Sequence, residues 1–140
     1  IFHLSTRTFT PGPDLLSERG NCAAVALDAR RILVVGGHDG ASELSSTEIL
    51  SLDTMAFALG PAMTTRRAGC DAVALDEHRI MVVGGFGSSG NLNVGGRSGS
   101  KPVSTTEILC IWTMAFAPGP SMGSARWVCA AVQVDAQHVL

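Results

Sequence analysis

The chain has 140 residues, of which 46% are hydrophobic, and its 10 Lys and Arg against 12 Asp and Glu give a formal net charge of −2. This composition supplies enough apolar surface for a core and excludes an intrinsically disordered chain. It also disfavours binding to nucleic acid or to an anionic membrane surface, because no basic field is present to attract either. No apolar stretch reaches the roughly 18–20 residues that a membrane-spanning helix requires.

One pattern occurs three times along the chain, first after 48 and then after 59 residues. The matching positions are Phe9, Phe57 and Phe116; Gly12-Pro13, Gly60-Pro61 and Gly119-Pro120; Arg19, Arg67 and Arg126; Cys22, Cys70 and Cys129. VVGG at 34–37 returns at 82–85, and STEIL at 46–50 returns as TTEIL at 105–109. A period of this size indicates a modular repeat fold.

One full repeat unit predicts four short strands. They are expected over 22–28, 31–37, 47–52 and around Phe57. The run at 31–37 is continuously apolar until it ends in two glycines, which suits a strand buried on both faces. The fourth strand stops at Gly60-Pro61, because proline has no N–H to donate to a β-ladder. Four strands joined by short turns predict one small antiparallel sheet.

The turns and glycines of the unit have predicted roles of their own. Asp28-Ala29-Arg30 and Asp76-Glu77-His78 read as hairpin turns, where an Asp carboxylate accepts hydrogen bonds from nearby backbone N–H groups. The glycine pairs are expected to adopt backbone conformations closed to residues with a Cβ. These glycines are Gly36, Gly37, Gly84 and Gly85.

The unit resembles the kelch repeat. The shared order is Arg, an apolar strand, an apolar strand ending in Gly-Gly, a loop, Ser-Thr-Glu with a third strand, an aromatic residue and Gly-Pro-x-Met. Kelch units are four-stranded blades of a β-propeller, so the resemblance implies an all-β fold, a partial β-propeller of four-stranded antiparallel blades. It covers nearly the whole chain except the loop at about 86–104. The segments are most similar to galactose-oxidase-type propellers, although Phe57 and Phe116 stand where Trp is usual.

The phase of the repeat predicts half a blade, two whole blades and another half blade. The expected boundaries are 1–18 for strands three and four of an incomplete blade, 19–65 and 66–124 for the two whole blades, and 125–140 for the first strands of another incomplete blade. An open arc leaves unpaired strand edges, so we expect a fragment of a longer protein. The alternative is head-to-tail self-association of two chains, in which the complementary half blades join.

The stretch that lengthens the second whole blade is the first candidate for binding. Residues 86–104 are rich in Gly and Ser, and loops on a rigid scaffold commonly carry binding residues. Arg97 and Lys101 are candidates to engage an acidic partner, and Phe86 or Leu92 is a candidate apolar anchor. Asn91 and Asn93 complete the predicted set. The alternative is a tolerated insertion without a function.

His38-Asp39 is the second candidate. A His beside a carboxylate can act as a base or a metal ligand, and the next blade has Phe86-Gly87 there, so the repeat does not impose the pair. The alternative is turn chemistry at Asp39-Gly40, with no catalytic role.

Charged residues that recur in every unit are expected to be architectural, because an active site is usually single. Arg19, Arg67 and Arg126 are expected to pair with Glu48, Glu107 or backbone groups within or between blades. Cysteines are expected as small buried apolar residues without disulfides. Cys110, where the previous blade has Ser51, is also expected to be buried.

The resemblance implies a protein-interaction scaffold whose partner is another protein. The alternative is a piece of a propeller enzyme, a galactose-oxidase-like oxidoreductase or similar, whose active site lies mostly outside the chain. Galactose oxidase depends on tyrosines, and this chain has none. No catalytic residue, metal or cofactor is expected. A carbohydrate-binding module is a third possibility, weakened by only two Trp. No targeting segment is visible, which favours the cytoplasm, but the start at Ile1 is expected to be truncated.

Overall fold

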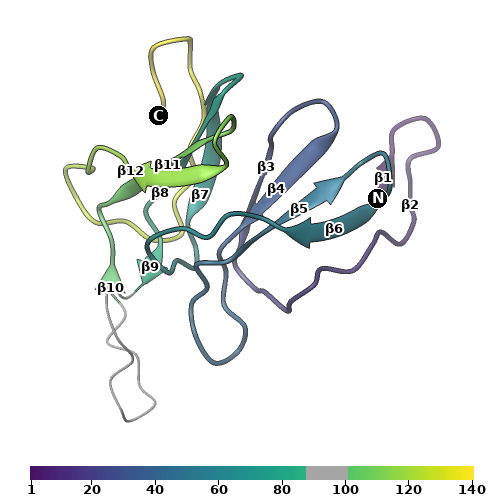
Figure 1. The fold of residues 1–140 in the computed structure, drawn as a ribbon, viewed down its shortest axis with the longest axis horizontal. Coiled ribbons are helices and arrows are strands. Elements are labelled where there is room, and N and C mark those ends of the chain that lie inside the picture. The colour runs from purple at the N-terminus through teal and green to yellow at the C-terminus, as the bar shows by residue number, and fades with distance from the viewer. Residues whose placement is uncertain (88–100) are drawn as a thin grey trace.

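The computed structural model describes residues 1–87 and 101–140, and every regular element in them is a β-strand (Figure 1). The strands are β1 (Phe2–His3), β2 (Thr8–Phe9), β3 (Ala23–Ala26), β4 (Arg31–Val35), β5 (Thr47–Ser51), β6 (Ala56–Leu59), β7 (Asp71–Asp76), β8 (Arg79–Val83), β9 (Phe86–Gly87), β10 (Lys101–Pro102), β11 (Thr106–Cys110) and β12 (Ala115–Pro118). The predicted all-β class is confirmed. In the part of the chain described, no helix is long and apolar enough to cross a membrane.

Two four-stranded antiparallel sheets form the body of the molecule. The first whole blade has the order β3-β4-β5-β6, and the second has the order β7-β8-β11-β12. Equivalent residues pair in both: Leu33 lies opposite Ile49, and Met81 lies opposite Ile108. The first strands β3 and β7 contact each other, while β6 and β12 lie at the outer edges (Figure 1). The prediction of repeated four-stranded blades is confirmed.

The two sheets share one core, which explains the residue types of their strands. The second strands β4 and β8 are apolar throughout their buried parts, and Leu33, Ile80 and Val82 are fully buried. Small residues occupy the first strands where the sheets converge, and Ala23 and Ala72 are buried there. Small side chains are therefore needed where β3 packs against β7.

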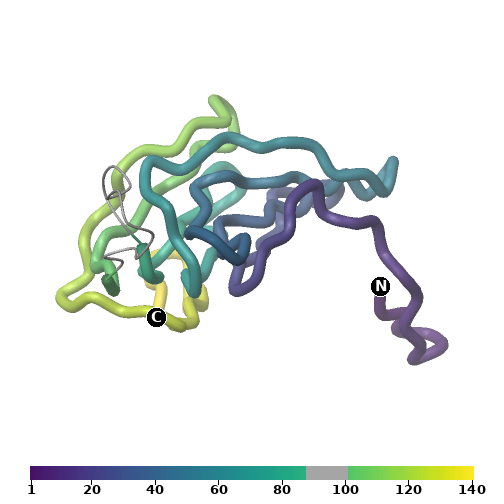
Figure 2. Tube along the Cα trace, turned by 90° about the horizontal axis from the view of Figure 1, so that it is seen from below, coloured from purple at the N-terminus to yellow at the C-terminus, as the bar shows by residue number. Residues whose placement is uncertain are grey.

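A hairpin flanks the two whole blades on each side (Figure 2). At the N-terminal side β1 pairs with β2, and the Phe2 and Phe9 rings lie 4.8 Å apart. At the C-terminal side, residues 132–140 form a hairpin in which the Val132 N–H donates to the Leu140 carbonyl at 2.9 Å. These hairpins correspond to the last two and the first two strands of a blade, so the described chain is a partial propeller.

The hairpin turns between first and second strands share one hydrogen bond. Asp28 Oδ1 accepts from the Arg30 N–H at 2.8 Å, and Asp76 Oδ1 accepts from the His78 N–H at 2.8 Å. Asp135 Oδ1 does the same with the Gln137 N–H at 2.7 Å. The predicted role of Asp in these turns is therefore confirmed, and a third turn shares it.

The four cysteines are free thiols. Cys70 is buried between the blades, and burial raises the pKa of its thiol to about 11, so this cysteine is unreactive near neutral pH. The expectation of burial is wrong for Cys22, Cys110 and Cys129, which are half-buried. Cys110 lies at the end of β11, where the strand leaves the core, and hydrogen bonds with the Thr113 side chain and backbone lower its pKa.

The glycine pairs end the second strands at the junction between blades. Gly36 and Gly37 have φ angles of 62° and 100°, in the left-handed region that favours glycine. The Gly37 N–H donates to the Arg67 carbonyl at 2.8 Å, so the next blade begins against this pair. A Cβ on Gly36 would overlap that same carbonyl oxygen.

Replacing Gly36 with Ala should therefore lower the free energy of unfolding by about 1–3 kcal/mol, through backbone strain and displacement of the Arg67 carbonyl. Gly123→Ala is the matched control, because nothing lies within 4 Å of a Cβ built there. Urea unfolding of both variants measures the effect. Equal unfolding midpoints would contradict a steric role for Gly36.

Candidate functional site

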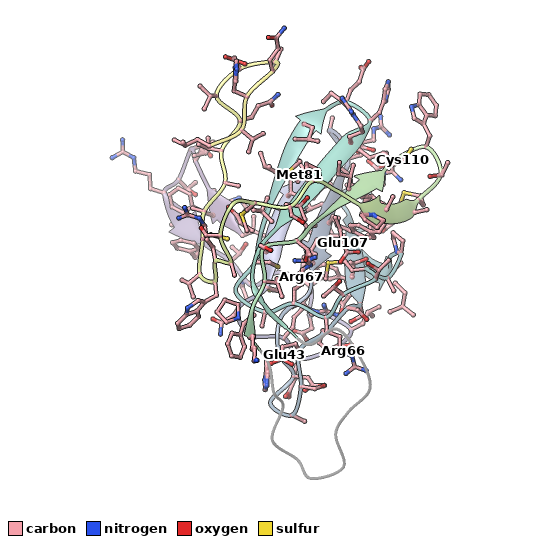
Figure 3. All side chains as sticks on the ribbon, turned by 90° about the vertical axis from the view of Figure 1, so that its left-hand side faces the viewer. Glu43, Arg66, Arg67, Met81, Glu107 and Cys110 are labelled. Atoms are coloured by element: carbon pink, nitrogen blue, oxygen red, sulfur yellow. The ribbon has the colours of Figure 1, made fainter. Side chains whose placement is uncertain are left out.

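Arg67 is the centre of a buried polar cluster in the second whole blade. Its Nη1 donates to the carbonyls of Gly84 at 2.8 Å and Thr105 at 2.9 Å. Its Nη2 donates to Thr105 Oγ1 at 2.9 Å and to Glu107 Oε1 at 3.2 Å. The Arg67 and Glu107 side chains are 0% and 2% exposed. Figure 3 shows the two side chains meeting in the middle of the blade.

Glu107 ties this cluster to the segment that enters the blade. Its Oε2 accepts hydrogen bonds from the Thr64 N–H at 2.6 Å and the Thr64 hydroxyl at 2.7 Å. Its Oε1 accepts from the Thr65 N–H at 3.0 Å. One carboxylate therefore joins the third strand, the buried Arg67 and the connection from the preceding blade.

The first whole blade repeats this cluster. Arg19 donates to the Gly36 carbonyl at 2.8 Å, the Ser46 carbonyl at 3.0 Å and Glu48 Oε1 at 2.7 Å. Glu48 also accepts from the backbone N–H groups of Leu16 and Ser17, at 2.7 and 3.0 Å. Two bonds differ. Among the residues described, Arg19 Nε has no acceptor, whereas Arg67 Nε donates to Glu107 Oε1 at 3.3 Å. The bond from the Thr64 hydroxyl to Glu107 has no counterpart in the first blade, where Leu16 stands. Both Arg–Glu pairs lie where one blade meets the next, so we interpret them as structural pairs.

The connections between second and third strands, and those that lead into the next blade, lie at one end of the sheets. In Figure 3, Glu43 and Arg66 mark this end, while Met81 and Cys110 lie toward the other and Arg67 lies between. We call this end the loop face. His38, Asp39, Phe86 and Lys101, all predicted as binding residues, belong to these connections.

His38 and Asp39 have the hydrogen bonds of a turn. His38 Nδ1 accepts from the Gly40 N–H at 2.9 Å. Asp39 Oδ1 accepts from the N–H groups of Ala41 and Ser42 at 2.8 and 2.7 Å. The bonds from Ser42 and Ala41 hold the pKa of Asp39 below its usual value. This geometry is that of a turn, the alternative considered for Asp39-Gly40, because both side chains bond to the backbone of their own loop.

Four residues on neighbouring connections of the loop face are named here the loop-face patch: Arg66, Phe86, Lys101 and Trp127. The Arg66 guanidinium is directed toward the first-blade loop, where its Nη1 donates to Ser42 Oγ at 3.5 Å. The Phe86 and Trp127 rings lie 6.0 Å apart. Lys101 pairs with Gly87 across β9 and β10, and the Gly87 backbone lies against the Arg66 carbonyl. Trp127 is 59% exposed, and Arg66 and Lys101 are exposed as well.

The patch departs from the repeat at every position. The equivalent residues one repeat earlier are Glu18, His38, Ser42 and Ala68. Two cations and two aromatic rings thus replace an acid, a histidine, a serine and an alanine. Arg66 and Trp127 were not among the residues predicted from the sequence, although a comparison of equivalent repeat positions shows that both depart from the repeat. Asn91, Leu92, Asn93 and Arg97 were predicted, and they lie outside the described residues.

The other hollow and the other charged clusters described here are weaker candidates for a functional site. A hollow of about 380 Å³ lies at the hairpin turns of the first blade, among Asp28, Arg30, Arg31 and Asp53. Its charges are already paired, Arg31 with Asp28 at 2.7 Å and Arg30 with Asp53 at 3.3 Å. Within 1–87 and 101–140, no group of three or more His, Cys, Asp and Glu is arranged to hold a metal ion.

Truncating Glu48 to Ala should lower the free energy of unfolding by about 3–5 kcal/mol, because it leaves the buried Arg19 charge and two backbone N–H groups without their acceptor. Glu77→Ala is the control, since the Glu77 side chain is 83% exposed. Chemical denaturation of each variant provides the comparison. Equal stability of Glu48→Ala and the parent would show that the pair is not structural.

The two glutamates should also make stability depend on acidity. Burial would raise the pKa of Glu48 and Glu107, but hydrogen bonds from Leu16, Thr64 and the arginines outweigh it and hold both pKa values below the ordinary 4.5. A carboxyl with a lowered folded-state pKa stabilises the fold above its unfolded-state pKa, and this stabilisation is lost as pH falls through the folded-state pKa.

We therefore expect the urea midpoint to fall below about pH 4.5, the ordinary glutamate pKa. The doubly substituted variant with Glu48→Gln and Glu107→Gln should lose part of this dependence. Some will remain, because Asp28, Asp76 and Asp135 also have lowered pKa values. An acid dependence identical in the variant and the parent would refute the assignment.

Comparison with known proteins agrees with this architecture. A family model for the kelch motif matches residues 19–64, which include β3 to β6 and the Arg19–Glu48 pair. A search of curated proteins found no match. The same Arg–Glu cluster and the same sheet recur in the second whole blade. The chain therefore contains a kelch motif at residues 19–64, and its antiparallel four-stranded sheets fit the blades of a partial β-propeller.

Proposed function

We propose that this chain serves as a protein-interaction scaffold and binds another protein through the loop-face patch. The observation that carries the proposal is that residues which break the repeat lie on neighbouring connections of the loop face, with the Phe86 and Trp127 rings 6.0 Å apart and Arg66 and Lys101 on the flanking segments. Repeated residues are explained by the fold, whereas these four are not. An exposed Trp with a neighbouring Phe and two cations has the composition of a recognition surface, since Trp and Arg are enriched among residues that dominate binding energy.

The charges of the patch favour an acidic partner. Arg66 and Lys101 are both exposed, and no ion pair joins either to an acid among the residues described. In the neighbouring first-blade loop, Glu43 is buried, and the exposed Asp39 carboxylate bonds to the N–H groups of Ala41 and Ser42 rather than to either cation. A partner segment with Asp or Glu beside an apolar side chain complements these features.

The blade junctions support the patch directly. Arg66 precedes Arg67, whose guanidinium is buried and bonded. Phe86 follows Gly85, whose N–H donates to the Arg126 carbonyl at 2.9 Å, and Trp127 follows Arg126. Three of the four patch residues are thus adjacent in sequence to residues that are held by hydrogen bonds where two blades meet. Such support reduces the entropy lost on binding.

The test is selection of peptides from a random phage-displayed library on the immobilised chain. The selected peptides should contain Asp or Glu beside an apolar residue. Arg66→Glu and Trp127→Ala should each weaken their binding by roughly ten-fold or more. The matched control is Arg30→Glu, an exposed arginine at the hairpin-turn end of the first blade. Unaltered melting of each variant checks the fold.

Peptides that bind the parent and both patch variants equally would contradict the proposal. A higher salt concentration should weaken binding of the selected peptides, because exposed charges are screened. Salt-independent binding would contradict the acidic chemistry assigned to the partner.

A further inference from the structure

The first-blade loop at residues 38–43 carries two acids that the repeat does not impose. Asp39 and Glu43 stand where the second blade has Gly87 and Pro102, and both blades pair across the loop in the same register. The loop-face patch has the opposite charge, with Arg66 and Lys101 on the connections beside this loop. The loop face is therefore acidic at the first blade and basic at the second.

Glu43 is the buried acid of this loop. It is 6% exposed, and it lies opposite His38 in an antiparallel bridge. Among the residues described, no hydrogen bond or ion pair reaches its carboxylate. A largely buried carboxylate is costly unless a donor or a cation pairs with it. The fold thus places an acid here without supplying its partner.

The carboxylate oxygens of Glu43 nevertheless remain within reach of a ligand. In the described part of the chain, Arg19 Nε is the one buried side-chain polar atom that lacks a hydrogen bond. The Glu43 oxygens have no bond from a described residue either, so they must touch solvent. The rest of the side chain is covered, which limits the rotamers that a ligand would have to fix on binding.

Asp39 presents a second acceptor from the same loop. Its Oδ1 accepts from the Ala41 and Ser42 N–H groups at 2.8 and 2.7 Å, and these bonds hold the turn. Within residues 1–87 and 101–140, its Oδ2 has no donor. One short loop therefore presents two carboxylates, with the turn between them already fixed.

The acidic loop adjoins the basic residues without pairing with them. Ser42 Oγ lies 3.5 Å from Arg66 Nη1, and the Leu44 carbonyl accepts from the Arg67 N–H at 3.0 Å. Figure 3 shows Glu43 and Arg66 at the same end of the sheets. No ion pair between described residues joins the loop's acids to either cation of the patch. Charges of both signs are thus free to meet a partner.

We propose that the loop at 38–43 binds a basic side chain, Arg or Lys, of the same protein segment whose acid meets Arg66 and Lys101. Glu43 accepts the hydrogen bonds of this cation, and Asp39 adds to its attraction. The Glu43 carboxylate has already lost most of its hydration in the fold, so pairing requires little further desolvation of the chain.

The inference rests on the scaffold function proposed above and adds the second half of the partner's chemistry. The partner carries one acid and one base at a fixed separation. A segment with acids alone would place like charge against Glu43 and Asp39, so the loop discriminates against it.

The test is selection from the random phage-displayed peptide library in parallel on the parent, Glu43→Gln and Glu77→Gln. Glu77→Gln is the matched control, because it makes the same chemical change in a hairpin-turn side chain that is 83% exposed. Peptides from the parent and Glu77→Gln should carry Arg or Lys at a constant separation from their Asp or Glu. Peptides from Glu43→Gln should keep the acid and lose the base.

A synthetic copy of one parent-selected peptide gives the size of the effect by isothermal titration calorimetry. Glu43→Gln in the chain should weaken its binding roughly ten-fold or more, the loss of one charge-assisted hydrogen bond. Replacing the basic residue of the peptide with Gln should weaken binding by a similar factor. Combining the two changes should add little, since both remove the same contact.

Parent-selected peptides with acids but no base would overturn this inference and leave the proposed scaffold function standing. Base-containing peptides that bind Glu43→Gln as tightly as the parent would overturn it as well. Glu43→Gln should not lower the melting temperature measured by circular dichroism, and a lower one would show that Glu43 serves the fold instead. A chain that selects no peptide would contradict the scaffold function itself, and this inference with it.

Discussion

The buried pair of Arg67 and Glu107 is the interaction on which the rest of the structure depends. Two charges removed from water are tolerated only when hydrogen bonds satisfy both, and here the partners come from three separate segments: the Gly84 carbonyl, the start of β11 and the connection that enters the blade. The glycine pair follows from this arrangement, since a Cβ at Gly84 or Gly85 would crowd the junction. Each blade is thereby fixed to the one before it.

The same constraint separates structural from functional residues. A residue that recurs in each blade serves the junction, as Arg19 and Glu48 do. A neighbour that does not recur is free to serve recognition, and Arg66 and Trp127 adjoin two of the repeated arginines. The proposed scaffold function uses the exposed neighbours of these arginines.

The repeat allowed most of the fold to be predicted from sequence, because a register repeated three times locates the strands, the Asp28 turn and the Gly36-Gly37 pair together. The candidate site was predicted only in part. Phe86 and Lys101 lie in the lengthened loop, but Trp127 reaches Phe86 from the next connection, and that contact depends on how blades stack. Cys110 was mispredicted because apolar periodicity does not show where β11 leaves the core. His38 and Asp39 bond to the backbone of their own loop, and their adjacency in the sequence does not by itself show those bonds.

A double-mutant cycle on Arg67 and Glu107 tests the central claim most directly. Free energies of unfolding would be measured for the parent, Arg67→Ala, Glu107→Ala and the double variant. If the pair joins the blades, each single change leaves a buried partner unsatisfied, and the double variant is little worse than either. The coupling energy should then reach about 2 kcal/mol or more, since contacting residues in one network couple strongly. Additive effects, with coupling below about 0.5 kcal/mol, would contradict the account.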